Sequence, residues 1–237
     1  MVDDLPDKKS RSQDVDAFLS KVALTPKRTD GAGKRGRLLF AMDATASRQP
    51  SWDIAAQIQG QMFIETAALG GLDIQLAFYR GFGEFKVGAW TDNERELLRL
   101  MTSVTCLAGQ TQIGKVLQHA VNEAKRGSLN ALVFVGDSVE EDIDHLGSVA
   151  GELGLLGVPA FIFHEGYDSV ARFAFEQVAK LTGGACMHFD ASSAEALREL
   201  LAAVAVYAAG GRLALEDKAH RDGGAVLQLT RQMRKST

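Results

Sequence analysis

The chain contains few cysteines, and this scarcity excludes two kinds of structural support. Only Cys106 and Cys186 are present, and they form no CxxC motif. A disulfide framework and a structural zinc site both need more cysteines at characteristic spacings. Neither disulfide stapling nor a structural zinc site is therefore expected.

Long hydrophobic runs are also missing. The longest apolar run, residues 200–209, is about half the length that a membrane span needs. The first residues include Asp3, Asp4 and Asp7, where a signal peptide would carry a basic and then an apolar segment. We therefore expect a cytoplasmic protein that does not associate with a membrane.

An excess of positive charge is absent as well. The formal net charge is -4, whereas a domain that binds nucleic acid is usually strongly basic. No nucleic-acid partner is therefore expected. What the chain does contain is apolar residues, since 46% of it is hydrophobic, which is enough to bury the core of one α/β domain.

Changes in composition divide the chain into three parts. Residues 1–35 form a tail with mixed charges and a glycine-rich linker, residues 36–210 form the expected domain, and residues 211–237 form a basic tail. A short apolar stripe predicts a helix over 15–24, which either packs on the domain or binds a partner. Weak alternation over 226–230 predicts either an added edge strand or a disordered tail.

Within the domain, apolar segments of strand length alternate with segments of helical periodicity. The expected strands are 38–42, 72–79, 85–90, 131–135, 158–163 and 186–189, and the expected helices are 52–69, 93–103, 111–126, 143–156, 169–181 and 194–209. Gly81 and Gly83 join the second and third strands in a hairpin, which makes the third strand antiparallel. The order predicts an α/β fold of the Rossmann-like, doubly wound type. Its six-stranded sheet is mostly parallel with one antiparallel edge strand, and helices cover both faces.

Oxygen-bearing side chains follow the two most apolar strands. Asp43, Thr45 and Ser47 come after strand 38–42, and Asp137 comes after strand 131–135. In the right-handed doubly wound order these strands are neighbours, and Thr111 lies on the loop beside them. We therefore expect these side chains to converge at the carboxyl edge of the sheet. Hydroxyl and carboxylate oxygens suit a hard cation, which favours Mg²⁺, with Mn²⁺ or Ca²⁺ as alternatives, over zinc.

Taken together, these residues resemble the metal-ion-dependent adhesion site (MIDAS) of von Willebrand factor A (VWA) domains. That pattern is Asp-x-Ser-x-Ser, then a Thr, then an Asp. Residues 43–47 match it with Thr45 in place of the first Ser, and residues 109–114 resemble the family's Gly-x-Thr-x-Ile/Leu-Gly segment. Gly136 and Ser138 flank the strand-end Asp, where the family more often has Thr or Ser before it and Gly after it.

The resemblance, which extends over about residues 37–209, implies a VWA-like domain with a divalent cation at the top of its sheet. It implies that three hydroxyls bind the ion directly, and that two aspartates bind it directly or through water. The hydroxyls are those of Thr45, Ser47 and Thr111, and the aspartates are Asp43 and Asp137. Mostly neutral ligands leave the ion under-compensated, so a carboxylate of a protein partner would complete its shell. Intracellular bacterial members of the family often act beside AAA-type ATPases.

Other interpretations of the same residues stay open. The polar residues can be helix caps: Ser47 or Ser51 for the first helix, Thr111 for the third, and Asp137 or Asp142 for the fourth. The acidic run over 140–144 is expected to be a solvated helix start.

Two nucleotide- or phosphate-directed motifs are incomplete. Residues 109–116 nearly match a phosphate-binding P-loop, but Val116 stands where Ser or Thr must hold Mg²⁺. Asp43 suggests a phosphoaspartate nucleophile, but Thr45 replaces the second acid that such phosphatases need. His164 and Glu165 end the fifth strand at the same edge of the sheet as the proposed metal site, and they either contact a partner or form a turn.

The sequence thus predicts a protein-binding module that depends on a divalent cation and is not an enzyme, because no catalytic set is visible. Two alternatives remain. One is a hydrolase or phosphotransferase that uses the same cation on a phosphate substrate. The other is a VWA scaffold that binds its partners without metal.

Overall fold

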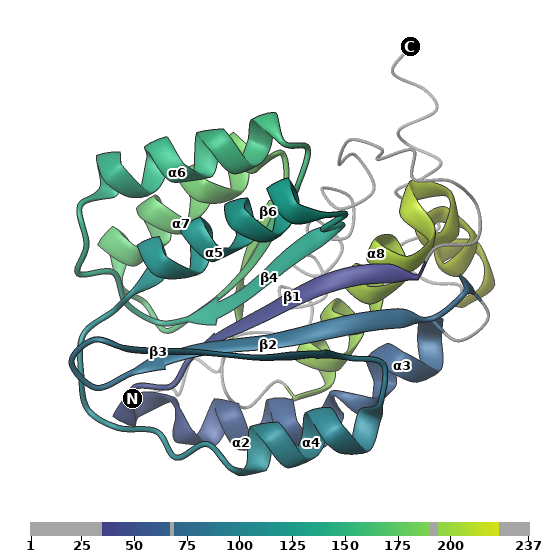
Figure 1. Cartoon of the computed structure of the whole chain (residues 1–237), viewed down its shortest axis with the longest axis horizontal. Helices are drawn as coiled ribbons and strands as arrows, with labels where there is room; N and C mark the ends of the chain where they lie inside the picture. Colours follow the sequence, from purple (N-terminus) through teal and green to yellow (C-terminus); the bar gives the residue numbers. More distant parts are fainter. Residues whose placement is uncertain (1–34, 67–68, 190–193, 223–237) are drawn as a thin grey trace, which may run out of the picture.

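The computed structural model describes residues 35–66, 69–189 and 194–222. One six-stranded sheet forms its centre, in the order β3-β2-β1-β4-β5-β6 (Figure 1). The strands are β1 (Gly36–Asp43), β2 (Leu72–Arg80), β3 (Glu84–Thr91), β4 (Ala131–Gly136), β5 (Ala160–Glu165) and β6 (Ala185–Phe189). β3 pairs antiparallel with β2, and all other pairs are parallel. The predicted mostly parallel sheet with one antiparallel edge strand is confirmed.

Helices cover both faces of the sheet, as expected. They are α2 (Gln49–Ile58), α3 (Gly60–Thr66), α4 (Glu94–Thr102), α5 (Ile113–Arg126), α6 (Ile143–Leu155), α7 (Ser169–Thr182) and α8 (Ala194–Asp222), with a short 3-10 helix η1 (Ala46–Arg48) before α2. Figure 1 shows α5, α6 and α7 on one face and α2, α4 and α8 on the other.

The central strand β1 packs against both helix layers. Leu38 and Phe40 contribute to the core on the side of α2 and α8, whereas Leu39 and Ala41 contribute to the core on the side of α5. These four side chains are fully buried. A strand covered on both faces is an uninterrupted apolar run because neither face meets water. The run ends at Asp43, where the chain leaves the sheet at its carboxyl edge.

The helix that we expected over 52–69 is two helices, so this prediction was wrong in its bounds. The first, α2, already starts at Gln49, since Pro50 suits the first turn of a helix. The break lies before Gly60, where an added Cβ would come 2.3 Å from a carboxyl oxygen of Glu94. The chain therefore breaks where the start of α4 packs closely against it.

The fifth strand is displaced relative to its expected range of 158–163. Pro159 has no N–H to donate to a neighbouring strand, and its carbonyl accepts a hydrogen bond from the Leu132 amide (3.0 Å) before β5 begins. The strand then continues through His164 and Glu165, which pair with β6. The alternative that these two residues form a turn is therefore wrong.

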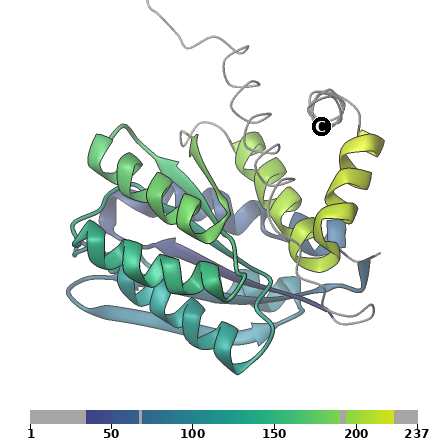
Figure 2. The same ribbon diagram turned by 90° about the horizontal axis from the view of Figure 1, so that it is seen from above.

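The last helix also differs from its expected range of 194–209. Helix α8 continues to Asp222, with a non-helical residue at Gly211 (φ 69°, ψ -165°). Figure 2 shows the two segments of α8 at an angle to each other. The helix expected over 15–24 and the strand considered over 226–230 lie outside the described residues.

Candidate metal site at the carboxyl edge of the sheet

The predicted site residues lie at one edge of the sheet because β1 and β4 are neighbours. Met42 of β1 pairs with Val135 of β4, so the next residues of both strands leave the sheet side by side. Asp43 is the last residue of β1, and Asp137 directly follows β4. Two carboxylates thus lie at the point where the strand order reverses, which is where open α/β sheets bind ligands.

Asp43 is fully buried and held by two hydrogen bonds. Its Oδ1 accepts from the amide of Thr45 (2.7 Å), and its Oδ2 accepts from the hydroxyl of Tyr79 (3.1 Å). Burial raises the pKa of Asp43, and the charge of Asp137 adds to this effect, while hydrogen bonds from Thr45 and the charge of Arg48 oppose it. Two hydrogen bonds thus orient the carboxylate, and the charge of Arg48 offsets only part of the cost of its burial.

Ser47 connects the loop after β1 to the loop after β4. Its exposed hydroxyl lies on η1 and donates to Oδ2 of Asp137 (2.8 Å). A serine oxygen that donates its proton keeps two lone pairs, so it can still bind a cation. The structure therefore places a hydroxyl and a carboxylate from different loops in contact, as a shared cation site requires.

Thr111 is joined to the same edge through Glu140. Its hydroxyl accepts from the Glu140 amide (3.0 Å), and its own amide donates to Oε2 of Glu140 (3.1 Å). Thr111 lies before α5, which begins at Ile113 and not at Thr111 as we expected. Of the five predicted residues, Asp43, Ser47, Thr111 and Asp137 each contact another loop or strand of this edge, and Thr45 contacts Asp43.

Helix capping does not account for these residues. The side chain of Asp142 caps α6 by accepting from the His145 amide (2.9 Å), so that alternative is confirmed for Asp142. The residues at the N-cap positions of η1, α2 and α5 make no capping hydrogen bond with their side chains. Ser47, Thr111 and Asp137 make tertiary contacts instead, so their position at this edge needs another explanation.

The start of α5 is capped by a carboxylate from another loop. Glu141 accepts from the amides of Ile113 (2.8 Å) and Gly114 (2.7 Å) through its two oxygens. A helix N-terminus can bind a phosphate through such free amides. Here the carboxylate of Glu141 accepts from both amides, so these amides are not free to bind a phosphate. The P-loop-like segment 109–116 also has Val116 where a P-loop needs Ser or Thr.

The donor set fits a hard divalent cation. The hydroxyl of Tyr79 donates to Asp43, and burial together with the negative charges of Asp43, Glu141 and Asp137 raises the pKa of Tyr79 well above its usual range. Hydroxyl and carboxylate oxygens are the ligand types that Mg²⁺ prefers. Among the described residues, no three His, Cys, Asp or Glu side chains gather in a way that could hold a metal ion by themselves, so a cation at this edge would need the hydroxyls as ligands as well. Metal binding by the five residues stays a prediction.

Sequence reasoning missed a buried ion pair beside the site. Arg48, the last residue of η1, is 1% exposed and forms an ion pair with Glu165 at the end of β5. Ser51 donates to the same carboxylate oxygen. The sequence placed Glu165 at this edge, but it carries no signal that Arg48 is buried, because arginines are mostly exposed.

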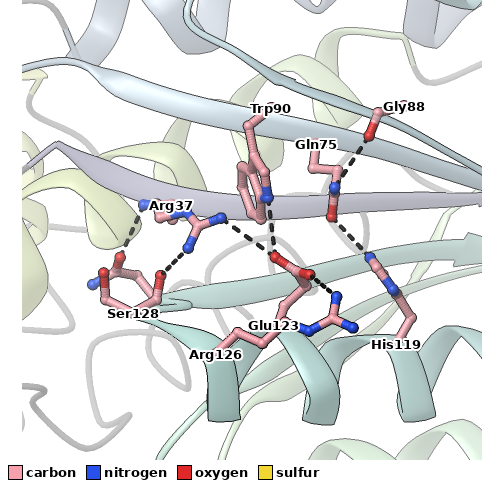
Figure 3. A network of polar contacts seen from close by, with 9 residues as sticks. Arg37, Gln75, Gly88, Trp90, His119, Glu123, Arg126 and Ser128 are labelled. Carbon is pink, nitrogen blue, oxygen red and sulfur yellow. Dashed lines mark hydrogen bonds and ion pairs between the residues drawn. The ribbon is translucent and has the colours of Figure 1, made fainter.

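A second polar cluster lies at the opposite end of the sheet (Figure 3). Glu123, on α5 and 6% exposed, accepts from Arg37 (3.3 Å) and from the indole of Trp90 (3.0 Å). The Arg37 guanidinium also lies 3.8 Å from the centroid of the Trp90 ring. His119 forms a hydrogen bond with Gln75 (2.8 Å). The Glu123 group and the His119–Gln75 pair each join α5 to strands of the sheet, so we assign the cluster a structural role.

Two exposed apolar residues lie on loops that border the candidate metal site. Phe82, in the β2–β3 hairpin, is 84% exposed, and Leu107 is 45% exposed. The Leu107 amide donates to the carbonyl of Ala44 (3.0 Å), and its carbonyl accepts from the Gly81 amide (3.5 Å). These contacts place the backbone of Leu107 beside the loop that carries Thr45 and Ser47, and Phe82 directly follows Gly81 in the hairpin. Single exposed apolar residues are common on protein surfaces, so these two residues are candidates for a partner contact only together with the site beside them.

Comparisons with known proteins find similarity at the level of structure. No protein-family profile and no curated protein matches the sequence. The VWA domain of SpRpn10 is 14% identical with a TM-score of 0.53, and the match covers 76% of this chain and 98% of that one. The von Willebrand factor type A structure from Catenulispora acidiphila is 15% identical with a TM-score of 0.59, over 71% of this chain and 42% of that one. An aerotolerance-related membrane protein from Bacteroides fragilis is 12% identical with a TM-score of 0.55, over 70% and 96%.

These identities are low, so the comparisons establish the fold and leave the ligand and the partner open. In the described part of this chain, no helix combines the length and the apolar character needed to cross a bilayer.

Proposed function

We propose that this chain, which has the von Willebrand factor A fold, is a divalent-cation-dependent module that binds a protein partner. The observation that carries the proposal is the contact between Ser47 and Asp137 beside the buried carboxylate of Asp43. The contact brings together two oxygen groups, a hydroxyl and a carboxylate, from two loops that are distant in sequence. Burial of Asp43 and the nearby charge of Asp137 make the Asp43 carboxylate costly without a cation, so its position suits cation binding.

Each predicted residue has a role in this proposal. Thr45, Ser47 and Thr111 would supply neutral hydroxyl ligands, and Asp43 and Asp137 would bind Mg²⁺ directly or through water. The bound ion would supply a positive charge that hydroxyl ligands only partly balance. A carboxylate of the partner would therefore complete the coordination shell.

The partner surface would extend from the ion to the exposed residues Phe82 and Leu107, which lie on loops that border the site. An apolar contact next to the ion–carboxylate contact would give affinity as well as orientation. By analogy with intracellular bacterial members of the fold family, an AAA-type ATPase is a candidate partner, and the proposed location is the cytoplasm. No catalytic role is proposed for any residue of the site.

Thermal unfolding tests the proposal. We expect 10 mM MgCl₂ to raise the Tm of the wild type relative to EDTA. A ligand at 100 times its Kd stabilises by about 2.7 kcal/mol, which is roughly 5–11 °C for a domain of this size. Ser47→Ala should lose this shift, and Ser138→Ala, which removes a neighbouring hydroxyl outside the predicted set, should keep it. Equal Tm values with and without Mg²⁺ or Mn²⁺ would contradict the proposal.

The second candidate function is a scaffold that binds its partner without metal. It is favoured by the hydrogen bonds that the site residues already make with each other, such as Ser47 with Asp137 and Thr111 with Glu140. A pull-down from lysate separates the two functions. The same partner should be retained by wild type and Thr111→Ala if no metal is needed, and lost by Thr111→Ala or in EDTA if the cation is required.

A further inference from the structure

The ion pair of Arg48 with Glu165 joins the loop after β1 to β5, a strand that is not next to β1 in the sheet. Arg48 directly follows Ser47 in sequence, and its Nη1 pairs with Oε2 of Glu165. Glu165 ends β5, which is separated from β1 by β4. Ser51, in the first turn of α2, donates to the same oxygen. One carboxylate therefore holds both η1 and the start of α2.

Stability alone does not explain this ion pair. The Arg48 side chain is 1% exposed and that of Glu165 is 16% exposed, so both charges are largely removed from water. The Nε and Nη2 atoms of Arg48 have no hydrogen-bond partner among the described residues. Apolar residues of similar volume are often as stabilising as a buried pair, or more so. An incompletely satisfied pair at this position points to a role in placing the adjacent loop.

The link fixes the part of the loop that carries Ser47. The Arg48 amide donates to the carbonyl of Thr45 (3.0 Å), which closes η1 around Ser47. The side chain of Arg48 then anchors η1 to β5, while the hydroxyl of Ser47 reaches Asp137 (2.8 Å). Without the anchor, the Ser47–Asp137 hydrogen bond, on which the site depends, would be the remaining described side-chain bond between η1 and the loop after β4.

We propose that Glu165, acting through Arg48, is a positioning residue that sets the cation affinity of the candidate metal site by fixing η1. The inference rests on the function proposed above for Ser47 and its neighbours. Groups that orient metal ligands typically change metal affinity by about 10–100-fold when they are mutated. Glu165→Gln keeps an acceptor for Ser51 and Arg48 but removes the charge, so the variant should still fold.

The matched control is Glu123→Gln. Glu123 is also a buried carboxylate that is paired with an arginine, but it lies in the cluster at the opposite end of the sheet (Figure 3). Both variants remove one buried charge, so both should lower the Tm in EDTA. Of these two variants, only Glu165→Gln should weaken Mg²⁺ binding. A second pair tests the arginine: Arg48→Lys keeps a cation beside Glu165, so it should lose less Mg²⁺ affinity than Arg48→Met.

Two measurements test the inference. Isothermal titration with MgCl₂ should show about 10-fold or greater weakening for Glu165→Gln and wild-type affinity for Glu123→Gln. Hydrogen exchange in EDTA should show faster exchange at the Arg48 amide in Glu165→Gln alone. Wild-type Mg²⁺ affinity together with unchanged exchange in Glu165→Gln overturns the inference and leaves the proposed function intact. If the wild type does not bind Mg²⁺, the proposed function is wrong and Glu165 has no effect on cation affinity. The rate of hydrogen exchange at the Arg48 amide then still tests whether Glu165 fixes η1.

Discussion

Replacing Asp43 with asparagine separates the charge of this carboxylate from its hydrogen bonds. Asparagine can accept from the Thr45 amide through its carbonyl oxygen and can donate to the Tyr79 oxygen, so both contacts survive in the variant. The charge is lost, and with it the cost of burying an ion beside Asp137. We therefore expect Asp43→Asn to be more stable than the wild type in EDTA at pH 7.

The size of the gain is limited because the hydrogen bonds from Thr45 and the charge of Arg48 already offset part of the burial cost. Relief of unfavourable charges commonly stabilises a protein by about 0.5–2 kcal/mol, so we expect about 1 kcal/mol. For a domain of this size, this is an increase of roughly 2–4 °C in Tm. In 10 mM MgCl₂ the order should reverse, because the wild type gains stability from the ion and the variant does not.

The pH dependence gives an independent check. The pKa of Asp43 is higher in the folded state than in the unfolded state. Between the two pKa values the folded state binds more protons, so stability falls as pH rises through this window, and the full cost remains above it. The Tm difference between Asp43→Asn and the wild type in EDTA should therefore shrink as pH is lowered through the folded pKa. A variant that melts several degrees below the wild type in EDTA, or a pH-independent difference, would refute this reasoning.

Three further variants test other contacts. Glu141→Gln weakens the charged cap on α5, and we expect a loss of about 1 kcal/mol in urea unfolding, whereas Glu152→Gln on the exposed part of α6 should change stability little. Glu123→Ala leaves Arg37 and Trp90 without their buried acceptor and should cost about 3–5 kcal/mol by the same measurement; a loss below 1 kcal/mol would show that water replaces it. Gly109→Ala places a Cβ 2.0 Å from the carbonyl oxygen of Gly81, so soluble protein with an unchanged Tm would contradict the observed loop packing.

The strand order of the sheet, and the position of Asp43 and Asp137 at the same edge of it, could be predicted from local sequence patterns. Uninterrupted apolar runs mark the central strands, because these strands are covered on both faces, and right-handed crossovers then leave few possible orders. Once β1 and β4 are neighbours, the residues that follow them must emerge together. Edge position and antiparallel pairing of β3 followed from the glycines of its hairpin.

The contacts that organise the loops could not be predicted in this way. The ion pair of Arg48 with Glu165 joins residues that are 117 positions apart, and no periodicity records such a pair. The acidic run over 140–144 was expected to be a solvated helix start, and Asp142 does cap α6. Glu141 from the same run caps a different helix, α5, because tertiary packing brings the two loops together. Which helix each acid caps depends on distances in the folded structure, and these distances cannot be read from the sequence.

The hydrogen bonds between the Thr111 segment and the β4–α6 loop also have a dynamic consequence. The amides of Thr111, Ile113 and Gly114 donate to glutamates of that loop, and the Glu140 amide donates back to Thr111. Neither segment can open without breaking bonds to the other, so these four amides should exchange with solvent as one cooperative unit. A partner that displaces Thr111 would therefore also move the β4–α6 loop at Glu140 and Glu141, and its binding would be detected at residues that it never touches.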